Sequence, residues 1–550
     1  MTMYAIGFDF GTETGRALLI HIETAEIIAT IEVAYPHGVI AKQLNDRPLK
    51  NAMVLQNPND YEWTLKELTE RIVKETNISK EQIKGIGIDF TSSTVLPITA
   101  DFEPLMKTPE FSKNPHAYAK LWKSHSADKE ARIITERLAA HPYLEKYGNI
   151  ISSEWLLPKL LEVIHDEPTL FNKMDYFIEA GDWLVAKLTG RLVRSNCMAG
   201  YKGLWQKSGN YLDRATLASI HPALEEVYDT KLVGDVLPVG TFAGYLREDM
   251  ANWLGLSCGT AVGVGMIDAH AAVIGAGLSE PNELLIVVGT SSCHLLLSEK
   301  ETVIPGISGV VEDGIIPGLF AYEAGQVAVG DIFSYFVKKQ LPEKYYIEAN
   351  LAGKSVFEVL NDYASKLEVG ESGLVALDWH NGNRTPFVNP NLSSVMVGET
   401  LLTESYEVYR ALVESTAFGT KVILDLFERN QVPVNRVVLT GGIPRKNHFL
   451  VQVYADVLQK EITVINQDHV SALGAAIIGV AAAKREPVND LIKQYAAKQI
   501  VQFKPNAQYQ KKYQQLYEIY QKLSTLFGKN ETILKELKEL KSKEEVLNSK

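Results

Sequence analysis

Two passages of the sequence repeat one local pattern, a β-prone strand that ends in a Gly-Thr turn and continues as a second strand. The first passage has the strand at residues 6–10 and the turn at residues 11–14. The second has a strand at residues 284–288, a turn at residues 289–292 and a further strand at residues 294–297. The repeat indicates two related halves, each presenting a hydroxyl-bearing turn to a shared cleft. The alternative is a chance match between two short segments.

The beginning of the chain predicts the order of elements in the first half. Residues 4–8, 17–22 and 28–33 are β-prone, and a helical stretch opens at Asn59-Asp60. Residues 83–89 return to a strand. The predicted order is therefore β-β-β-α-β, which differs from a simple βαβ repeat.

The length of the chain predicts more than one domain. A chain of 550 residues is too long for a single hydrophobic core. Pro281 lies between the two similar passages and favours a boundary there. We predict an N-terminal domain at residues 1–278, a C-terminal domain at residues 279–500 and a helical extension at residues 501–550.

Two helices are predicted in the second half. Residues 404–429 form a long amphipathic pattern. The stretch at residues 472–483 is rich in alanine and glycine and is too short to span a membrane. It predicts a tightly packed internal helix, and Ser471 is the expected residue at its N-terminal cap.

Charge and cysteine content exclude several classes of protein. The chain has 67 acidic and 55 basic residues and a formal charge of −12, which argues against binding to nucleic acid or to an anionic membrane. The N-terminus lacks the pattern of a signal peptide. Cys197, Cys258 and Cys293 are too few and too widely spaced for a zinc site or a disulfide framework, so we expect buried thiols in a reducing cytoplasm.

The first Gly-Thr turn has the composition of a phosphate-binding loop. Gly11 and Gly15 allow the backbone to approach a ligand closely, and Thr12 and Thr14 add hydroxyl groups beside exposed N–H groups. The strand before the turn carries Asp9, which tolerates a phosphate nearby only if a cation intervenes, so Mg²⁺ is implied. The alternative is an ordinary hairpin with Gly and Thr at its turn.

A third glycine-containing strand end supports a nucleotide site. The predicted strand at residues 436–439 is followed by Thr440, Gly441 and Gly442. Bare backbone at such glycines permits a flat group such as adenine to lie against it. Gly-Gly alone is a weak signal, but three such strand ends in this order are much more specific.

Other nucleotide and metal motifs do not match the sequence. There is no GxxxxGK[ST] loop, and the twelve histidines show no HExxH or paired ligand spacing. Gly263 and Gly265 begin a dinucleotide-binding pattern, but Asp268 stands where its third glycine belongs. Asp268 lies instead at a predicted helix start, where a carboxylate is favoured as the anion and could accept a proton from a hydroxyl group. The alternative for Asp268 is a plain N-cap.

Taken together, these motifs resemble the FGGY family of carbohydrate kinases, which belongs to the superfamily of actin and the heat-shock chaperone ATPase domain. DFGTETGR resembles the first phosphate motif of the family, LLIVVGTSS the second and VVLTGG the adenosine motif. EVYRALVE resembles the C-terminal signature helix, and VSALGAAIIG the helix after the adenosine loop. The resemblance covers roughly residues 3–485.

The resemblance implies an α/β fold of two actin-like (ribonuclease H-like) domains with an interdomain cleft for nucleotide and sugar. It implies ATP and Mg²⁺ as cofactors, a homodimer as the assembly, Asp9 and Asp268 as catalytic residues and Asp9 as the metal-binding residue. The residues implied to contact the nucleotide are Gly11, Thr12, Glu13, Thr14, Arg16, Gly289, Thr290, Gly330, Gly441, Gly442 and Asn447.

Further segments resemble the branch of the family that acts on ribulose. They are IDFTSST, LWKSHSA, SSEW, EAGDWL, AGYKGLW and YEAGQVAVGD. The resemblance implies ATP-dependent phosphorylation of a ketopentose, L-ribulose to L-ribulose 5-phosphate, with Asp268 taking the proton of the hydroxyl group. The residues implied to contact the sugar are Trp122, Lys123, His125, Lys202, Asp268 and Glu323.

Two alternative functions remain open. One is an FGGY kinase for another pentulose, a polyol or glycerol, because the sequence departs from the family pattern at Glu162, after Pro158-Lys159, and at Glu399. The other is an actin-like or chaperone-type ATPase that uses nucleotide as a conformational switch. Such an ATPase would not need a carboxylate beside the γ-phosphate together with a polar sugar pocket.

Overall fold

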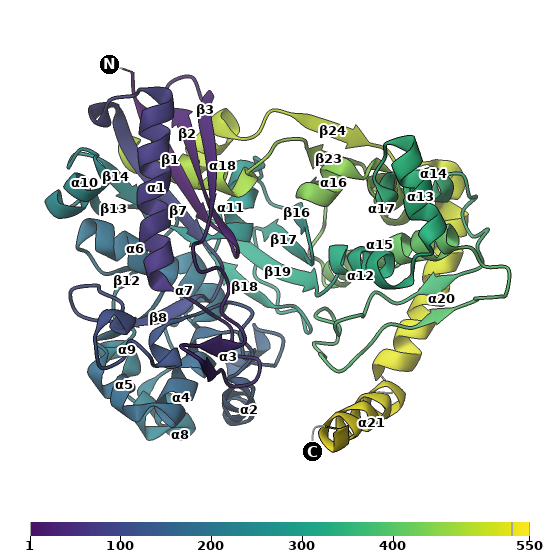
Figure 1. Cartoon of the computed structure of the whole chain (residues 1–550), viewed down its shortest axis with the longest axis horizontal. Helices are drawn as coiled ribbons and strands as arrows, with labels where there is room; N and C mark the ends of the chain where they lie inside the picture. Colours follow the sequence, from purple (N-terminus) through teal and green to yellow (C-terminus); the bar gives the residue numbers. More distant parts are fainter. Residues whose placement is uncertain (1, 530–531, 549–550) are drawn as a thin grey trace.

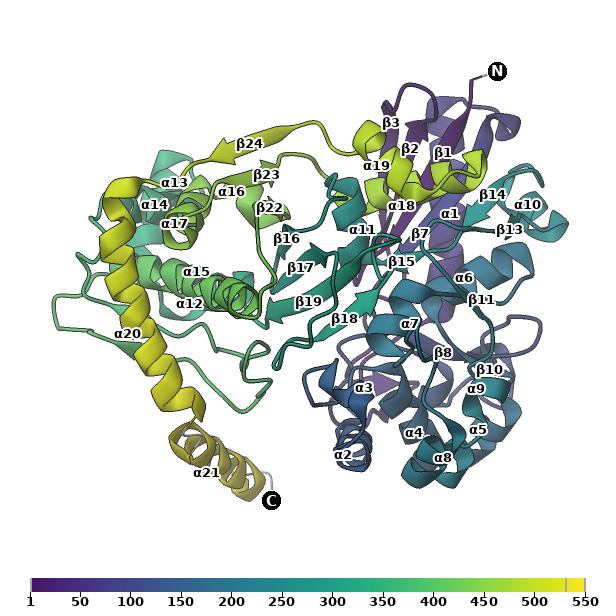
Figure 2. The ribbon, with the colours of Figure 1, turned by 180° about the vertical axis from the view of Figure 1, so that it is seen from behind.

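The computed structural model describes residues 2–529 and 532–548, and these residues form two lobes (Figures 1 and 2). The N-terminal lobe contains the beginning of the chain, and the second lobe contains the long helix α15 (Ser405–Arg429). Each lobe is built on one large sheet that carries a phosphate-type turn. In the part of the chain that the structure describes, none of the helices has the length and apolar character needed to cross a bilayer.

The sheet of the N-terminal lobe begins with the predicted meander. Its strands run in the order β13-β14-β7-β1-β2-β3, and β15 pairs with the far end of β7. Strands β1 and β2 are antiparallel, whereas β7 runs parallel to both β1 and β14. The bounds are β1 Tyr4–Phe10, β2 Thr14–His21, β3 Ile27–Ala34, β7 Ile83–Phe90, β13 Phe242–Tyr245, β14 Ala261–Gly263 and β15 Met266–Ile267. Helix α1 (Pro58–Thr76) covers one face, so the predicted β-β-β-α-β order is confirmed for the large sheet and α1. The chain also forms three two-residue strands between β3 and α1, which the sequence did not predict.

The sheet of the C-terminal lobe repeats the same arrangement. Its order is β18-β19-β17-β16-β22-β23-β24, with β16 antiparallel to β17 and parallel to β22. The bounds are β16 Glu283–Val288, β17 Ser292–Ser298, β18 Gly309–Glu312, β19 Phe320–Gln326, β22 Arg436–Thr440, β23 Ile462–Ile465 and β24 Ile500–Phe503. Five strands in each lobe therefore share one topology, β3-β2-β1-β7-β14 and β19-β17-β16-β22-β23. The repeated Gly-Thr pattern marks the first hairpin of each.

Helix α18 (Val470–Lys484) joins the two halves of the chain. It follows the strands of the C-terminal lobe, yet it packs on β1 and β7 of the N-terminal lobe (Figure 2). A Cβ atom at Gly7 would lie 2.2 Å from the Ala472 carbonyl oxygen, and one at Gly87 would lie 1.9 Å from the Ala475 carbonyl oxygen. Backbone therefore touches backbone, and this explains the alanine- and glycine-rich sequence that predicted an internal helix.

The predicted start of this helix was wrong. His469, with a left-handed backbone, is the N-terminal capping position, and Ser471 already lies within the first turn. Ser and Thr are favoured at caps because their side chains can accept from the first N–H groups, but His469 occupies the position without such a bond. The close approach of α18 to the sheet therefore places the helix start ahead of the residue that propensity favours.

A smaller sheet and several helices complete the N-terminal lobe. The sheet has the order β10-β8-β9-β6, formed by β6 Leu55–Gln56, β8 Val95–Ile98, β9 Ala119–Lys120 and β10 Tyr176–Glu179. Short pairs are β4 Gln43–Leu44 with β5 Arg47–Pro48 and β11 Val193–Ser195 with β12 Asp235–Leu237. The helices are α2 Asp128–Arg137, α3 Pro142–Glu145, α4 Leu156–Asp166, α5 Pro168–Lys173, α6 Ala180–Thr189, α7 Asn196–Lys202, α8 Arg214–Ile220, α9 Val227–Thr230, α10 Glu248–Leu254 and α11 Asp268–Gly275.

Helices surround the second sheet and continue into the end of the chain. They are α12 Gly330–Gln340, α13 Glu343–Ala352, α14 Val356–Ala364, α16 Gly442–Lys446, α17 His448–Leu458, α19 Val488–Tyr495, α20 Gln510–Lys529 and α21 Thr532–Asn548, with β20 Val375–Ala376 and β21 Met396–Val397 paired beside them. Helix α20 packs along the C-terminal lobe (Figure 1). The predicted domain boundaries at residues 278 and 500 stay a prediction. Helices α18 and α19 belong to the predicted C-terminal domain, but they pack against elements of the N-terminal domain.

Replacing Gly87 with alanine tests the packing of α18. We expect the free energy of unfolding to fall by about 3 kcal/mol or more, because the new methyl group meets backbone atoms that cannot move aside. The control is Gly259→Ala, where the nearest atom to a new Cβ would be 3.7 Å away. Urea unfolding followed by circular dichroism measures both variants. Equal stability of the two variants would contradict the packing described here.

Candidate functional site

Three aspartates meet at the ends of adjacent strands in the N-terminal lobe. Asp9 is the penultimate residue of β1, and Asp89 is the penultimate residue of β7 and lies opposite Asp9 in the parallel register. Asp268 directly follows β15, which pairs with the end of β7, and it is the first residue of α11. Because parallel strands end at one edge of a sheet, the fold gathers the three carboxylates at that edge.

Burial and repulsion between charges raise the pKa of two of these carboxylates, Asp89 and Asp268. Asp89 is fully buried, and neither of its oxygens accepts a hydrogen bond. Burial and the neighbouring charges of Asp9 and Asp268 raise the pKa of Asp89 well above its usual value. Asp268 keeps some exposed surface but is enclosed by protein, and burial with the charge of Asp9 raises its pKa to about 7. Such a group can exchange a proton near neutral pH.

The same carboxylates fit a divalent cation that is shared with a ligand. Asp9 is only 4 % exposed, and Asp89 brings two oxygens without a donor to the same place. Among the described residues, no group of three His, Cys, Asp or Glu side chains is arranged to hold a metal by itself. Mg²⁺ does not need such a cage, because it binds through one or two carboxylates, waters and phosphate oxygens.

The first Gly-Thr turn adjoins Asp9 directly. The Gly11 N–H donates to the Thr14 carbonyl oxygen at 3.0 Å and closes the turn. The Arg16 guanidinium donates to Asp9 Oδ2 at 3.0 Å and to Thr14 Oγ1 at 2.8 Å. Thr12 is half-buried, Glu13 is exposed, and both follow Gly11 in the turn. The structure thus places all the predicted residues of this turn beside Asp9, with Arg16 paired to the carboxylate.

The second Gly-Thr turn lies at the end of β16. Gly289 and Thr290 are exposed, and their carbonyl oxygens accept from the N–H groups of Gly330 at 3.0 Å and Val329 at 2.8 Å. The predicted residue Gly330 therefore begins α12 against the turn. Because β22 runs parallel to β16, the third glycine-containing strand end lies beside this turn.

Gly441 and Gly442 mark that third strand end. Gly441 has a φ of +115°, and a Cβ there would lie 2.2 Å from the Val288 carbonyl oxygen, so only glycine fits. Gly442 is exposed and has open space around its Cα atom. Asn447 is buried, and its side chain accepts from the Leu450 N–H group and donates to the Tyr409 hydroxyl group. Its side chain caps the N-terminus of α17. The predicted contact of Asn447 with nucleotide stays a prediction.

A buried polar cluster links the two lobes. Lys202 from α7 donates to Glu323 Oε1 on β19 at 2.8 Å, and His270 Nε2 on α11 lies 3.1 Å from Glu323 Oε2. Cys197 Sγ lies 3.0 Å from His270 Nδ1. Since the thiol is a donor, Nδ1 accepts and the Nε2–H group donates to Glu323. Burial acts to raise the pKa of Glu323, but Lys202 and His270 hold it well below its usual value.

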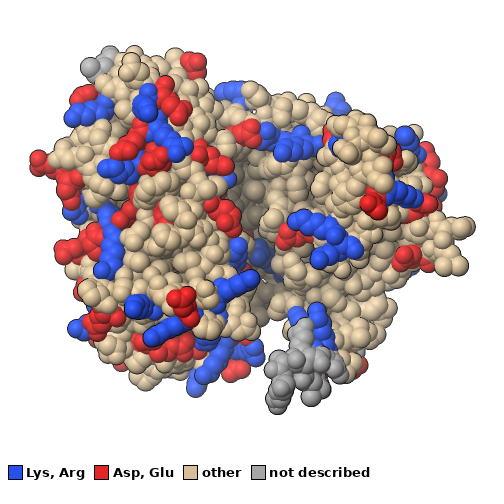
Figure 3. All heavy atoms as spheres, in the orientation of Figure 1, with Lys and Arg blue, Asp and Glu red and all other residues tan. Residues whose placement is uncertain are grey.

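The cluster lies close to Asp268, because the charge of Glu323 acts on the Asp268 carboxylate. The structure therefore brings together Lys202, Glu323 and Asp268, three of the residues expected to contact the sugar. The space-filling view shows the surface hollowed between the two lobes (Figure 3). Polar groups from both lobes therefore meet beside Asp268.

The loop that carries Trp122, Lys123 and His125 lies beside the first turn. The Trp122 Nε1–H group donates to Thr12 Oγ1 at 3.0 Å. Lys123 is half-buried, whereas His125 is exposed and has Nδ1 3.2 Å from Ser153 Oγ. Trp122 thus lies against the phosphate-type turn, and His125 lies at the outer end of the loop.

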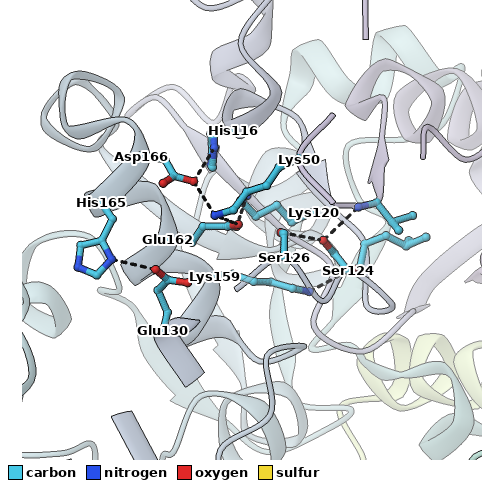
Figure 4. Close-up of polar contacts among 12 residues, drawn as sticks. Lys50, His116, Lys120, Ser124, Ser126, Glu130, Lys159, Glu162, His165 and Asp166 are labelled. Carbon is cyan, nitrogen blue, oxygen red and sulfur yellow. Dashed lines mark hydrogen bonds and ion pairs between the residues drawn. The ribbon is translucent and has the colours of Figure 1, made fainter. Parts of the chain in front are cut away.

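A buried ion-pair network contacts the start of this loop (Figure 4). Glu162 on α4 accepts from Lys120 at 2.8 Å and from Lys50 at 3.1 Å. Lys159, also on α4 and fully buried, donates to the carbonyl oxygens of Ser93 at 2.7 Å and Leu121 at 2.9 Å. Burial lowers the pKa of Lys159 to about 7. Lys159 thus joins the turn after β7 to the loop after β9.

Three residues of the site were not predicted from the sequence. Asp89 lies in IDFTSST, a segment quoted for its resemblance alone, although a carboxylate after an apolar strand is the same signal that pointed to Asp9. His270 and Cys197 gave no signal, because their partners are distant in sequence: Cys197 contacts His270, and His270 contacts Glu323 of the other lobe. The expectation of buried thiols is right for Cys197 and wrong for Cys258, which is exposed in a loop, while Cys293 is intermediate.

Family models of carbohydrate kinases match both lobes. The N-terminal domain of the FGGY family of carbohydrate kinases matches residues 4–275, and its C-terminal domain matches residues 284–483. The chain belongs to the FGGY family. It is 44 % identical over 555 residues to a ribulokinase of Shouchella clausii, covering 99 % of each chain. It is 42 % identical over 548 residues to a ribulokinase of Anoxybacillus flavithermus, covering 98 % of this chain and 97 % of that one.

Solved structures of sugar and glycerol kinases share the fold. A ligand-bound xylulose kinase from Lactobacillus acidophilus superposes with a TM-score of 0.80 at 18 % identity, covering 96 % of this chain and 99 % of that one. A Plasmodium falciparum glycerol kinase with ADP gives 0.75 at 17 % identity, covering 95 % and 98 %. The predicted fold of two actin-like α/β domains is confirmed, and so is the membership of the FGGY family.

Replacing Glu162 with glutamine tests the network below the loop. Lys120 would then be buried without a counter-charge, so we expect the free energy of unfolding to fall by about 3–5 kcal/mol. Asp166→Asn, which alters the more exposed pair with Lys50, should cost less than about 1 kcal/mol. Equal losses measured by urea unfolding would contradict the network.

The pH dependence of stability gives a second test of the same network. Burial acts to raise the pKa of Glu162, but Lys120 lowers it from 4.5 to about 2. Burial also lowers the pKa of Lys120, but the Glu162 carboxylate, which accepts from Lys120 at 2.8 Å, opposes this effect and favours the ionised pair. The stabilisation is therefore present above pH 4.5 and is lost as the pH falls toward 2. Between these values the unaltered protein should lose more stability than Glu162→Gln.

Proposed function

We propose that this chain transfers the γ-phosphoryl group of ATP to the terminal hydroxyl group of L-ribulose and forms L-ribulose 5-phosphate. The observation that carries the proposal is the position of Asp268, at the start of α11 and next to the buried Lys202–Glu323–His270 cluster. The relatives of nearly equal length that are 42–44 % identical are ribulokinases, which supports ribulose as the acceptor. Two phosphate-type turns and the Gly441–Gly442 strand end support ATP as the donor.

The acceptor side of the site suits a polyhydroxy compound. Lys202 is a donor and Glu323 is an acceptor, and both hold fixed positions because each is buried and paired. Such groups recognise hydroxyl groups by directed hydrogen bonds. Asp268 would orient the terminal hydroxyl group and take its proton to Oδ2, since Oδ1 already accepts from the Ala269 N–H group at 2.7 Å. The raised pKa of Asp268 suits this role at neutral pH.

The donor side would hold the triphosphate between the two turns. Thr12 and Thr290, with adjacent N–H groups, would bind phosphate oxygens, and Gly441 and Gly442 would leave room for adenosine. When bound, Mg²⁺ would reduce the negative charge on the phosphate oxygens, and Asp9 would hold it through water. Asp89 adds a second carboxylate at the same position. Positioning and electrostatic stabilisation would supply most of the rate.

Several finer predictions remain proposals that rest on the family resemblance. They are Mg²⁺ as the cation, a homodimer as the assembly, the cytoplasm as the compartment and the division into domains at residues 278 and 500. Gel filtration with light scattering would measure the assembly, and a monomer would contradict the homodimer.

A coupled assay of ADP release tests the proposed acceptor. We expect the purified protein with Mg·ATP to release ADP with L-ribulose at a kcat/KM at least about tenfold above that with D-xylulose, ribitol or glycerol. Hydrolysis without acceptor should be much slower, because water lacks the contacts that hold the sugar. A higher kcat/KM for another acceptor would contradict L-ribulose. Acceptor-independent turnover of equal rate would contradict a kinase altogether.

Replacing Asp268 with asparagine tests the proton acceptor. Asparagine keeps the shape and removes the base, so kcat should fall about 10²-fold or more. Binding of L-ribulose, measured by calorimetry, should change little, because the Lys202–Glu323 pair remains. Near-normal turnover by Asp268→Asn would refute the role assigned to Asp268.

A further inference from the structure

Helix α20 buries a row of tyrosines against the core of the C-terminal lobe. Tyr513, Tyr517 and Tyr520 are each at most 3 % exposed, and all three rings lie within 6.4 Å of the Phe418 ring on α15. The helix belongs to the extension beyond the residues that match the family models. Its packing alone would give it a structural role.

One of these tyrosines begins a hydrogen-bond chain that runs to the second phosphate-type turn. The Tyr520 hydroxyl group donates to Asp378 Oδ1 at 2.7 Å, and Gln326 Nε2 donates to Asp378 Oδ2 at 2.8 Å. The Ser292 hydroxyl group donates to Gln326 Oε1 at 2.9 Å. Tyr520, Asp378, Gln326 and Ser292 are all at most 5 % exposed, so water does not compete for these bonds. We call this set the tyrosine relay.

The partners of Gln326 fix the orientation of its amide group. Its nitrogen faces two acceptors, Asp378 Oδ2 and the Thr416 carbonyl oxygen, at 2.8 and 2.9 Å. Its oxygen faces two donors, the hydroxyl groups of Ser292 and Thr420, both at 2.9 Å. Reversal of the amide would turn its oxygen toward Asp378 Oδ2 and the Thr416 carbonyl oxygen, which can only accept, so both of these bonds would be lost. The direction of every hydrogen bond in the relay is therefore fixed. At the inner end of the relay, the Ser292 hydroxyl group donates its proton to Gln326.

Helix α15 leaves room for the relay at one position. A Cβ atom at Gly419 would lie 2.4 Å from Gln326 Nε2 and 2.5 Å from Asp378 Oδ2. The carboxylate and the amide can therefore meet against the helix backbone only because residue 419 has no side chain. Asp378 has no cation in this set, and burial raises its pKa, so its charge depends on the donors Gln326 and Tyr520.

The inner end of the relay lies in the loop proposed to bind phosphate. Ser292 is the last residue of the turn that begins at Gly289, and it pairs with Gln326 across β17 and β19. The turn is held on its other side by α12, whose first N–H groups donate to Gly289 and Thr290. The relay is thus the side-chain support of the turn, and α12 supports its exposed residues, Gly289 and Thr290, through backbone hydrogen bonds.

We propose that Tyr520 is a positioning residue for the nucleotide, which acts from the C-terminal extension through Asp378 and Gln326 on the second phosphate turn. The proposal rests on the proposed function, because it assumes that this turn binds ATP. Without the Tyr520 hydroxyl group, Asp378 loses a charge-assisted donor that fixes its carboxylate, and this weakens the hold of Asp378 on Gln326 and, through Gln326, on Ser292. The turn would then spend part of its time in arrangements that do not fit phosphate.

Tyr520→Phe tests the relay, and Tyr517→Phe is its matched control. Both changes remove one buried hydroxyl group from the same helix, but Tyr517 donates to Asp425, outside the relay, at 2.7 Å. The measurements are the Kd of Mg·AMP-PNP by calorimetry, the KM for L-ribulose and the thermal unfolding temperature. We expect Tyr520→Phe to raise the Kd about fivefold to tenfold and to leave the sugar KM within about twofold. Tyr517→Phe should lower the thermal unfolding temperature by a similar amount, but it should leave both the Kd and the KM unchanged.

The outcome separates positioning from simple stabilisation. Equal nucleotide affinity in Tyr520→Phe and the unaltered protein, or an equal loss in Tyr517→Phe, would overturn the proposal. Ser292→Ala supplies a second route: it should weaken AMP-PNP binding, and Tyr520→Phe added to it should have almost no further effect. Fully additive losses would contradict a single relay. If the unaltered protein fails to bind AMP-PNP, the proposed function fails and this proposal fails with it.

Discussion

The contact of α18 with β1, β7 and α11 is the constraint on which the rest of the structure depends. Glycines in both strands bring the backbone of α18 against the sheet, and Gly474 does the same against Ala271 of α11. The helix comes from the end of the second half of the chain, so this packing locks the second half to the first. It also fixes where β1, β7 and α11 meet, and that junction is where the three aspartates lie.

The electrostatics of the cleft follow from that junction. Three carboxylates enclosed at one sheet edge repel one another, and burial adds to the cost of their charges, so the site is poised to bind a cation and to accept a proton. The acceptor pocket is balanced differently, because Lys202 and His270 compensate Glu323 across the lobes. The site therefore combines a side where three carboxylates share one cation, Arg16, with a side where Lys202 balances Glu323.

Local patterns predicted much of this arrangement, whereas contacts between distant residues escaped them. The strand ends at Asp9, Thr290 and Gly441 can be predicted from the sequence, because strand periodicity and turn composition are local signals. Asp89 also follows an apolar strand, as Asp9 does, but it was not predicted as a site residue. The tyrosine relay and the His270–Glu323 bond join residues up to 142 positions apart, and single residues such as tyrosine or histidine indicate no partner by themselves. The wrong cap at Ser471 shows tertiary packing overriding propensity.

A crystal structure of the complex with L-ribulose, Mg²⁺ and AMP-PNP tests the central claim most directly. The claim is that phosphoryl transfer takes place where the two lobes bring the Asp268 carboxylate and the two Gly-Thr turns together. The account predicts the terminal hydroxyl group of the sugar within hydrogen-bonding distance of Asp268, with the γ-phosphate between Thr12 and Thr290. Sugar bound away from Asp268, or a triphosphate that touches neither threonine, would contradict it.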